Sequence, residues 1–505
     1  MSIKNKIIIF CAVLCLAQAN AWATAKKMFQ NSLDITALTS ASCSYGEHAP
    51  FWFTNNRHGL STTNPNSIMA RASLVGDMSW NNRFGIDYCA DIAAAAGFEK
   101  NVYIHQLYAD FSYKWLNLSI GSKERWGELK NPELSSGGMT WSGNCRPIPQ
   151  IRLEVPDFAA FAGGWVALKG HIAVGTLTDS EYRRNVDYPR IATNVRFHSK
   201  AGFVRFGNSE KFPLNFIFGL EMYALYGGQV YNNQTGEKLQ ELQSGWAGLK
   251  TVLLPFNKTG EQGMNNGNTL GSWHFAFTWT QKDWNAKVYY EHFYEDHSSM
   301  LGIEYKNDMN GKKRFVTYGF KHDFADGLWG VELNGPKSWP VRTVVFEFLN
   351  TYNQCGALLN YPNPDLLEEV SGRDDFYAHG IYAAYTHCGY GIGNPLILSP
   401  VYNKDGSPKY ISNRIHAYHI GVNGNAGDKV EWKVLADLTY SWGLYQAPFR
   451  NVVKNTMIML EGAYSFGKNN SWKTIMDLGF DFDKSDYLGN NAGVMLSIVK
   501  RFNVL

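Results

Sequence analysis

The chain has 505 residues, and 47 Lys and Arg against 44 Asp and Glu give a formal net charge of +3. So small a charge makes no case for nucleic acid as a partner, since phosphate backbones are bound through large basic patches. Aromatic residues make up 15% of the chain, with 28 Tyr and 16 Trp. No run of about 20 apolar residues follows the N-terminal region, which excludes a helical membrane protein. Two classes remain, a secreted all-β protein and an outer-membrane β-barrel.

The N-terminal region has the pattern of a secretory signal peptide. A basic start and an apolar stretch at residues 7–17 precede a small-x-small site at residues 21–23. Such a segment is removed on export. We expect residues 1–23 to be the signal peptide and residues 24–505 to form a single barrel domain, although cleavage after residue 25 also fits the pattern.

Five cysteines remain after this cleavage, and an odd number leaves at least one thiol unpaired within the chain. They are scattered singly, without a C-x-x-C pair: Cys43, Cys89, Cys145, Cys355 and Cys388. This spacing predicts neither a zinc site nor a disulfide scaffold.

Several segments alternate apolar and polar residues with a period of two, which is the signature of β-strands. In the clearest, Trp273, Phe275, Phe277 and Trp279 share one face. The other segments are residues 115–121, 430–442, 472–483 and 494–502. The longer ones match the 9–11 residues of a tilted transmembrane strand, and Trp or Tyr often stands where a membrane interface would fall.

These patterns predict an all-β fold, a transmembrane antiparallel β-barrel of the outer membrane with 16 to 18 strands. A secreted sandwich would have to bury wide aromatic faces in one core of nearly 500 residues without a domain break. Two segments stay undecided at this stage. Residues 31–44 are weakly patterned, and residues 67–78 fit either a short helix or a strand.

Residues 135–150 differ from the strands around them. They hold three glycines and two prolines, Pro147 and Pro149, which cannot donate to a sheet ladder. Irregular backbone must be kept away from lipid. We therefore expect this segment to lie inside the strand wall or beyond the membrane plane.

Eight motifs, in order over most of the mature chain, resemble the Wzi capsule-assembly family of outer-membrane proteins. The most specific is residues 136–150 (SGGMTWSGNCRPIPQ). The others are residues 265–273, 289–296, 326–330, 347–356, 372–377, 391–396 and 413–421. Cys145 and Cys355 stand where small residues are expected, a mild departure. The resemblance implies an 18-stranded barrel with an occluded lumen and short periplasmic helical elements. It also implies a non-enzymatic, lectin-like protein that retains capsular polysaccharide at the cell surface during capsule assembly.

A polysaccharide site needs aromatic platforms for the C–H faces of sugars and guanidinium groups for their carboxylates. The residues that we select on this ground are Arg57, Arg125, Trp126, Trp141, Arg146, Arg183, Arg373 and Tyr377. The alternative is that these side chains fill the lumen as ion pairs and aromatic packing.

The sequence contains no motif that predicts a catalytic or a metal site. No G-x-S-x-G motif is present. His416 and His419 are three apart and fall on opposite faces of a strand. Residues 481–486 alternate carboxylates but lack the glycine and glutamate of a calcium loop, and we interpret them as the polar end of a strand. We expect no catalytic residue, metal or cofactor.

The expected partners are capsular polysaccharide and outer-membrane lipid, with contact to polysaccharide export machinery left open. A porin-like channel for oligosaccharides is the alternative function, in which residues 135–150 would form a constriction.

Overall fold

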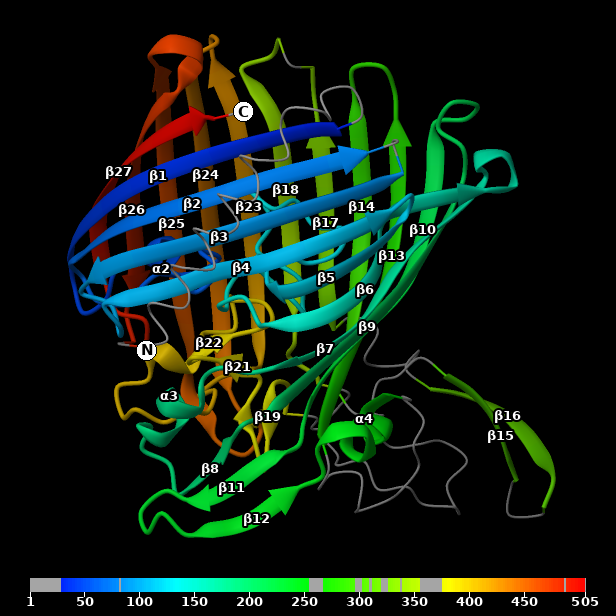
Figure 1. Ribbon diagram of the computed structural model, residues 1–505. Helices are drawn as coiled ribbons and strands as arrows, with labels where there is room; N and C mark the ends of the chain where they lie inside the picture. Colours follow the sequence, from blue (N-terminus) through cyan, green and yellow to red (C-terminus); the bar gives the residue numbers. More distant parts are fainter. Residues whose placement is uncertain are drawn as a thin grey trace, which may run out of the picture.

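The computed structural model describes residues 29–80, 83–253, 267–295, 302–307, 311–318, 326–336, 338–354, 375–485 and 487–504. Eighteen antiparallel strands form one sheet, in which each pairs with the next and the last, β27 (Asn491–Asn503), pairs with the first, β1 (Phe29–Tyr45). The sheet therefore closes into a barrel (Figure 1). This confirms the predicted outer-membrane β-barrel, at the upper end of the expected strand number.

The barrel wall is built from long strands joined in sequence order. Between β1 and β27 they are β2 (Ser67–Trp80), β3 (Phe84–Ala96), β4 (Val102–Tyr113), β5 (Leu116–Ser122), β6 (Gln150–Phe161), β7 (Val166–Thr176), β9 (Arg196–Phe206), β10 (Leu214–Tyr226), β13 (Gly267–Thr280), β14 (Asn285–Glu295), β17 (Gly327–Asn334), β18 (Val341–Asn350), β23 (Ile415–Ala426), β24 (Val430–Gly443), β25 (Pro448–Phe466) and β26 (Trp472–Asp483). All five predicted strand segments are confirmed, and the two undecided segments form β1 and β2.

Smaller elements lie in the connections. They are the helices α2 (Phe51–Thr54), α3 (Ser180–Arg184) and α4 (Gly245–Leu253), the one-turn helices η1 (Ala162–Gly164), η2 (Pro400–Tyr402) and η3 (Lys468–Asn470), the sheet of β8 (Arg190–Thr193), β11 (Gly228–Asn232) and β12 (Lys238–Leu242), the pair β15 (Gly302–Asn307) and β16 (Lys313–Tyr318), and the two-residue strands β19 (Ala378–His379), β20 (Ala383–Ala384), β21 (Thr386–His387) and β22 (Tyr390–Gly391). Among the described helices, none is long and apolar enough to cross a membrane.

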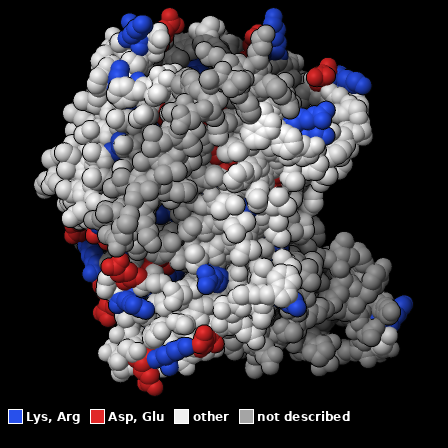
Figure 2. Space-filling view, in the orientation of Figure 1, with Lys and Arg blue, Asp and Glu red and all other residues white. Residues whose placement is uncertain are grey.

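The period of two sorts the side chains of each strand between the two faces of the wall. On β13, Phe277 is 52% exposed on the outer face, whereas the neighbouring Ala276 is 1% exposed on the inner face. The side of the molecule seen in Figure 2 is mostly uncharged across the middle, and Lys, Arg, Asp and Glu gather towards its two ends. An apolar band between polar ends is what a lipid bilayer requires of a barrel wall.

The two ends of the barrel differ in the length of their connections. The start of β1 and the end of β27 lie at the upper end in Figure 1, together with the short turns. The shortest of these turns is residues 114–115, and the longest is residues 207–213. The lower end has long connections: residues 46–66, 123–149, 177–195, 227–266, 296–326 and 351–414. In outer-membrane barrels the short turns face the periplasm. By this rule the long-loop end is the outward end.

The described helices lie at both ends of the barrel. α3 and α4 are at the outward end, and α2 follows the outward end of β1. At the short-turn end the described chain has only η1 and η3. Turns this short have no room for longer helices, so helices form in the long connections instead.

Parts of the long connections fold back into the barrel. We use the word plug for α2 together with residues 123–149 and 375–402. Every residue in 134–145 and 382–400 is buried. Leu134, Met139, Phe376 and Tyr377 belong to the largest hydrophobic cluster and are at most 1% exposed. The lumen is thus occluded by the chain itself, and residues 135–150 lie inside the strand wall as expected.

Four of the five cysteines lie in the described residues. Cys43, Cys89, Cys145 and Cys388 are free thiols, and all but Cys43 are buried. Cys355 lies outside the described residues.

Candidate functional site

Buried carboxylates on the inner face of the wall hold the plug in place. Glu347 on β18 accepts hydrogen bonds from the Ser135 hydroxyl (2.6 Å) and the Ser136 backbone N–H (2.7 Å). Glu291 on β14 accepts one from the Met139 backbone N–H (2.8 Å). Because these donors are buried and would otherwise be unpaired, each of these bonds contributes to holding the plug.

A second group of bonds fixes α2 against β24 and β26, the two neighbours of β25 in the wall. The Trp52 indole donates to Asp437 of β24 (2.7 Å), and the Phe51 backbone N–H donates to Asp481 of β26 (2.9 Å). His419 of β23 bridges Asp437 and the Leu134 carbonyl, at 2.7 and 2.6 Å. The plug is therefore bonded to several strands around the barrel.

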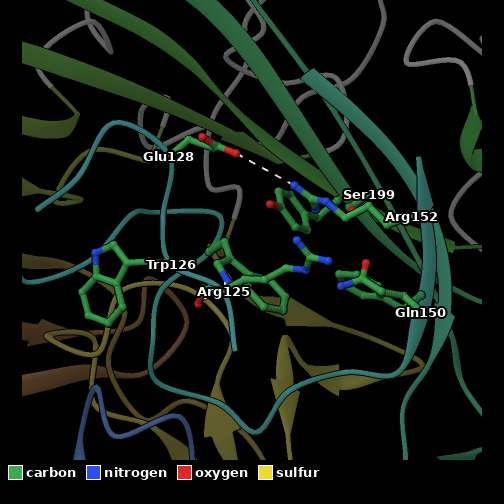
Figure 3. Close-up of a pocket in the computed structure, with 9 residues that line it drawn as sticks. Arg125, Trp126, Glu128, Gln150, Arg152 and Ser199 are labelled. Atoms are coloured by element: carbon green, nitrogen blue, oxygen red, sulfur yellow. Dashed lines mark hydrogen bonds and ion pairs between the residues drawn. The ribbon is translucent and has the colours of Figure 1, made fainter. Parts of the chain in front are cut away.

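Arg125 and Trp141 come together within this packing. The Arg125 guanidinium lies 3.2 Å from Glu154 and donates to the Ser119 hydroxyl (2.8 Å). The Trp141 indole donates to the Arg125 carbonyl (3.1 Å) and stacks on Tyr223, with ring centroids 5.6 Å apart. Figure 3 shows the arginine side chains of this region, Arg125 and Arg152, beside each other and close to Gln150 and Ser199. The void between them is about 10 Å³, room for no more than about one water.

Arg183 and Tyr377 are also structural in their contacts. Arg183 pairs with Asp179 (2.9 Å) and donates to two carbonyl groups, those of Tyr382 (3.2 Å) and Thr386 (3.1 Å). Tyr377 is fully buried, and its hydroxyl donates to the Met139 carbonyl. For these residues, as for Arg125 and Trp141, the contacts favour the lumen-filling interpretation. Arg373 lies outside the described residues.

Besides Arg125, three selected residues keep accessible surface: Arg57, Trp126 and Arg146. The Trp126 ring packs over Gly143, where a Cβ would lie 1.8 Å from it. Arg146 lies 4.9 Å from the centroid of the Tyr103 ring. The Arg57 side chain is 32% exposed and pairs with Asp477 at 3.1 Å. Arg57 differs from the other two because it lines a cavity large enough for a ligand.

That cavity lies between the inner faces of β27, β1 and β2 and the segment of residues 49–62, and its volume is about 250 Å³. Ser40, Ser42 and Ser497 line one side, and Phe53 and Phe98 contribute aromatic surface. Phe98 comes from the outward connection between β3 and β4, so the cavity reaches the outward end of the barrel. We call it the serine cavity.

Charged groups of the serine cavity are paired with one another. Arg71 lies 2.9 Å from Glu124, and its Nε also donates to Asp91 at 2.9 Å. Glu124, on the loop after β5, lies 2.7 Å from the His105 ring nitrogen. Burial alone would raise the pKa of Glu124, but the His105 hydrogen bond and the charges of His58 and Arg71 lower this pKa to about 2. Glu124 is therefore an anion that these neighbours stabilise.

A buried acidic cluster elsewhere has the residue types of a cation site. The possible ligand atoms of Glu221, His274 and Glu291 lie within 4.8 Å of one another. However, Lys130 Nζ lies 2.8 Å from Glu291, and the Thr140 hydroxyl donates to Glu221. The plug thus supplies positive charge and donors to this cluster itself, which makes it a further attachment between plug and wall.

The end of β26 behaves as the predicted polar strand end. Asp483 accepts hydrogen bonds from the backbone N–H groups of Tyr487 and Leu488, each 2.7 Å long. Its carboxylate therefore caps the turn that follows.

Sequence reasoning missed the carboxylates that hold the plug and the serines of the cavity. Glu291 and Glu347 each stand in a mostly apolar or aromatic strand, at an inward position of its alternation. Ser40 and Ser42 alternate within the segment that was only weakly patterned. These isolated polar residues at alternate positions were the available signal.

Outward loops carry exposed pairs of a basic and an aromatic side chain. The cation lies over the ring at 5.9 Å for Arg184 and Tyr231, 4.9 Å for Lys409 and Tyr188, and 5.5 Å for Lys250 and Trp246. Trp246 of α4 is 63% exposed. Such pairs offer both an aromatic face and a cation to a ligand at the cell surface.

No family model matches the chain, and no curated protein matches its sequence. Among solved structures, the chain is similar to Wzi of Escherichia coli, described as an outer-membrane protein involved in group 1 capsule assembly and a carbohydrate-binding β-barrel. The identity is 15%, the match covers 97% of this chain and 88% of that one, and the TM-score is 0.54. It also matches OccK5 (OpdH) of Pseudomonas aeruginosa at 8% identity, 94% and 99% coverage and a TM-score of 0.45. OpdQ of the same organism matches at 7% identity and a TM-score of 0.47, and the match covers 94% of this chain and 100% of that one. The chain thus has a Wzi-like fold, that of an outer-membrane β-barrel.

Proposed function

We propose that this protein is a non-enzymatic outer-membrane barrel that binds and retains capsular or similar surface polysaccharide, and so takes part in capsule assembly. The observation that carries the proposal is the filled lumen. Residues 134–145 and 382–400 are buried within the barrel and bonded to its wall, and a filled lumen suits a protein that holds a polymer better than one that passes it.

Two further features support this function. The outward loops present exposed cation–aromatic pairs, such as Lys250 with Trp246, which suit the faces and charges of sugars. The likeness in fold to Wzi, a carbohydrate-binding barrel, agrees with it. Polysaccharide is accordingly the proposed partner on the outward side, and outer-membrane lipid surrounds the wall.

The test is to measure how surface polysaccharide divides between cells and medium in a strain that lacks the protein. Shedding into the medium at unchanged total amounts is the expected result. Restoration by the full chain is the control. Polymer that stays attached to the cells would refute retention.

Planar-bilayer conductance tests the alternative, a porin-like channel for oligosaccharides. With the plug in place we expect no steady open-channel current from the purified protein. A stable conductance that falls when oligosaccharide is added would favour the channel.

Export belongs to the same proposal. We propose that residues 1–23 are removed and that the mature chain begins at Thr24. N-terminal sequencing of protein from the outer-membrane fraction tests this directly, and an uncleaved Met1 would contradict it.

A further inference from the structure

We propose that the serine cavity binds one neutral sugar unit, a branch or a chain end of the surface glycan. This inference rests on the proposed function and adds to it the position of a subsite and the chemistry of its ligand.

The cavity exists because three neighbouring strands carry small side chains on their inner faces. Ser40 of β1 lies opposite Ser497 of β27, and Ser42 lies opposite Ser67 of β2. The two hydroxyls of Ser42 and Ser67 are 2.8 Å apart. Where the wall instead carries Glu291 or Glu347, the plug is bonded against it. Over β27, β1 and β2 the small serines leave open space between wall and plug.

The charges around the cavity argue for a neutral ligand. Arg57 is paired with Asp477, and Arg71 is paired with Asp91 and Glu124. An acidic sugar would have to separate one of these pairs to gain a guanidinium partner. Breaking a partly buried ion pair leaves an uncompensated charge, so this exchange is unfavourable.

The remaining groups match a sugar ring. Ser40 and Ser497 offer hydroxyls that both donate and accept. Phe53 and Phe98 supply aromatic surface for the C–H face of a sugar. A neutral hydroxyl-rich ring with one apolar face is the ligand that uses both kinds of group.

The wall of the cavity is held in place at Phe98. The Thr62 hydroxyl and the Asn64 side-chain amide both donate to the Gly97 carbonyl, at 3.0 and 2.6 Å. Gly97 has φ +82°, and a Cβ there would lie 2.4 Å from the Asn66 carbonyl oxygen. This locked turn fixes the residue that follows it, so the aromatic surface is ready before a ligand binds.

Size limits the ligand to a short unit. The volume of about 250 Å³ lies just below the roughly 300–1,000 Å³ typical of pockets for drug-sized ligands. A single ring with its substituents fits such a space, whereas a length of polymer does not. The rest of the glycan would continue over the outward loops.

The experiment measures binding of three neutral methyl glycosides to the full-length protein in detergent, those of glucose, galactose and mannose, with glucuronic acid alongside. Ser40→Tyr fills the cavity. Thr39→Tyr is the matched control, since Thr39 is adjacent to Ser40 on the same strand but is exposed on the outer face. We expect at least one neutral glycoside to bind more tightly than glucuronic acid, Ser40→Tyr to lose at least tenfold in affinity, and Thr39→Tyr to stay within twofold.

Phe98→Ala is a second variant, outside the barrel strands, that keeps the test valid if Ser40→Tyr does not fold. It should lose at least threefold in affinity. Absence of binding by all three glycosides, preference for glucuronic acid, or unchanged affinity in both cavity variants would overturn the inference. Failure here together with polymer shedding in the deletion strain would leave the proposed function standing. Glycoside binding without polymer shedding in the deletion strain would leave the sugar subsite standing and refute the proposed function.

Discussion

Glu347 is the residue whose removal most directly tests how the plug is held. It is 1% exposed and accepts hydrogen bonds from Ser135 and Ser136 of the plug and from the Tyr289 hydroxyl on the wall. Glu347→Ala would leave three buried donors without their acceptor. The barrel strands would still pair, because their ladder does not depend on this side chain.

The expected loss of stability follows from the number of donors. An unsatisfied buried donor costs about 1–3 kcal/mol, and hydrogen bonds to charged groups are at the upper end of the range. The three donors share one acceptor, so their costs do not simply add. We expect Glu347→Ala to lower the free energy of unfolding by at least about 3 kcal/mol.

Urea unfolding in detergent, followed by tryptophan fluorescence, measures the loss. Trypsin digestion of the folded protein measures plug loosening, since Arg125 and Lys130 are cleavage sites within the plug. Glu431→Ala is the control, because its 2.6 Å pair with Lys473 is exposed and worth at most about 1 kcal/mol. Equal urea midpoints and equal digestion of the two variants would refute the role given to Glu347.

Three further results are expected. Arg125→Ala should lower stability by about 1.5–3 kcal/mol, because Glu154 loses one of its two arginine partners and keeps the other, Arg152; an unchanged urea midpoint with lost polymer retention would instead assign Arg125 to binding. Glu124→Gln should be less stable than wild type at pH 7, and this difference should shrink as the pH falls from about 4.5 to about 2, since a carboxyl with a lowered pKa stabilises the fold only while ionised; a difference independent of pH would contradict this. Gly421→Ala should increase trypsin cleavage of the plug, because its Cβ would lie 2.3 Å from the Leu134 carbonyl oxygen, whereas Gly462→Ala, with no atom within 4 Å, should behave as wild type.

The barrel itself could be predicted from the sequence because its signals are local. Strand alternation depends on residues two apart, and membrane-strand length and terminal aromatics are read within one segment. Residues 273–280 and 430–442 therefore gave strands at the predicted places, in β13 and β24. Two prolines and three glycines likewise predicted irregular backbone at residues 135–150, either inside the strand wall or beyond the membrane plane, and the structure shows that this segment lies inside.

The positions of the helices could not be predicted in this way. Family resemblance implied short helical elements on the periplasmic side, where η1 and η3 lie, and it gave no sign of the longer α3 and α4 at the outward end. A connection can be assigned to one end of the barrel only when every strand before it is known. A single missed strand would place all later connections at the wrong end.

The sequence by itself thus determined the class of protein, the strands of the β wall and the irregular backbone of residues 135–150, because these follow from patterns within one stretch of chain. Only the tertiary structure decided which partners individual side chains contact. Arg125 and Arg183 carry the residue type of a sugar site, yet partners distant in sequence enclose them in ion pairs and carbonyl contacts. Ser40 and Ser497 meet because the last strand closes on the first, and this closure, which no local pattern contains, creates the cavity between them.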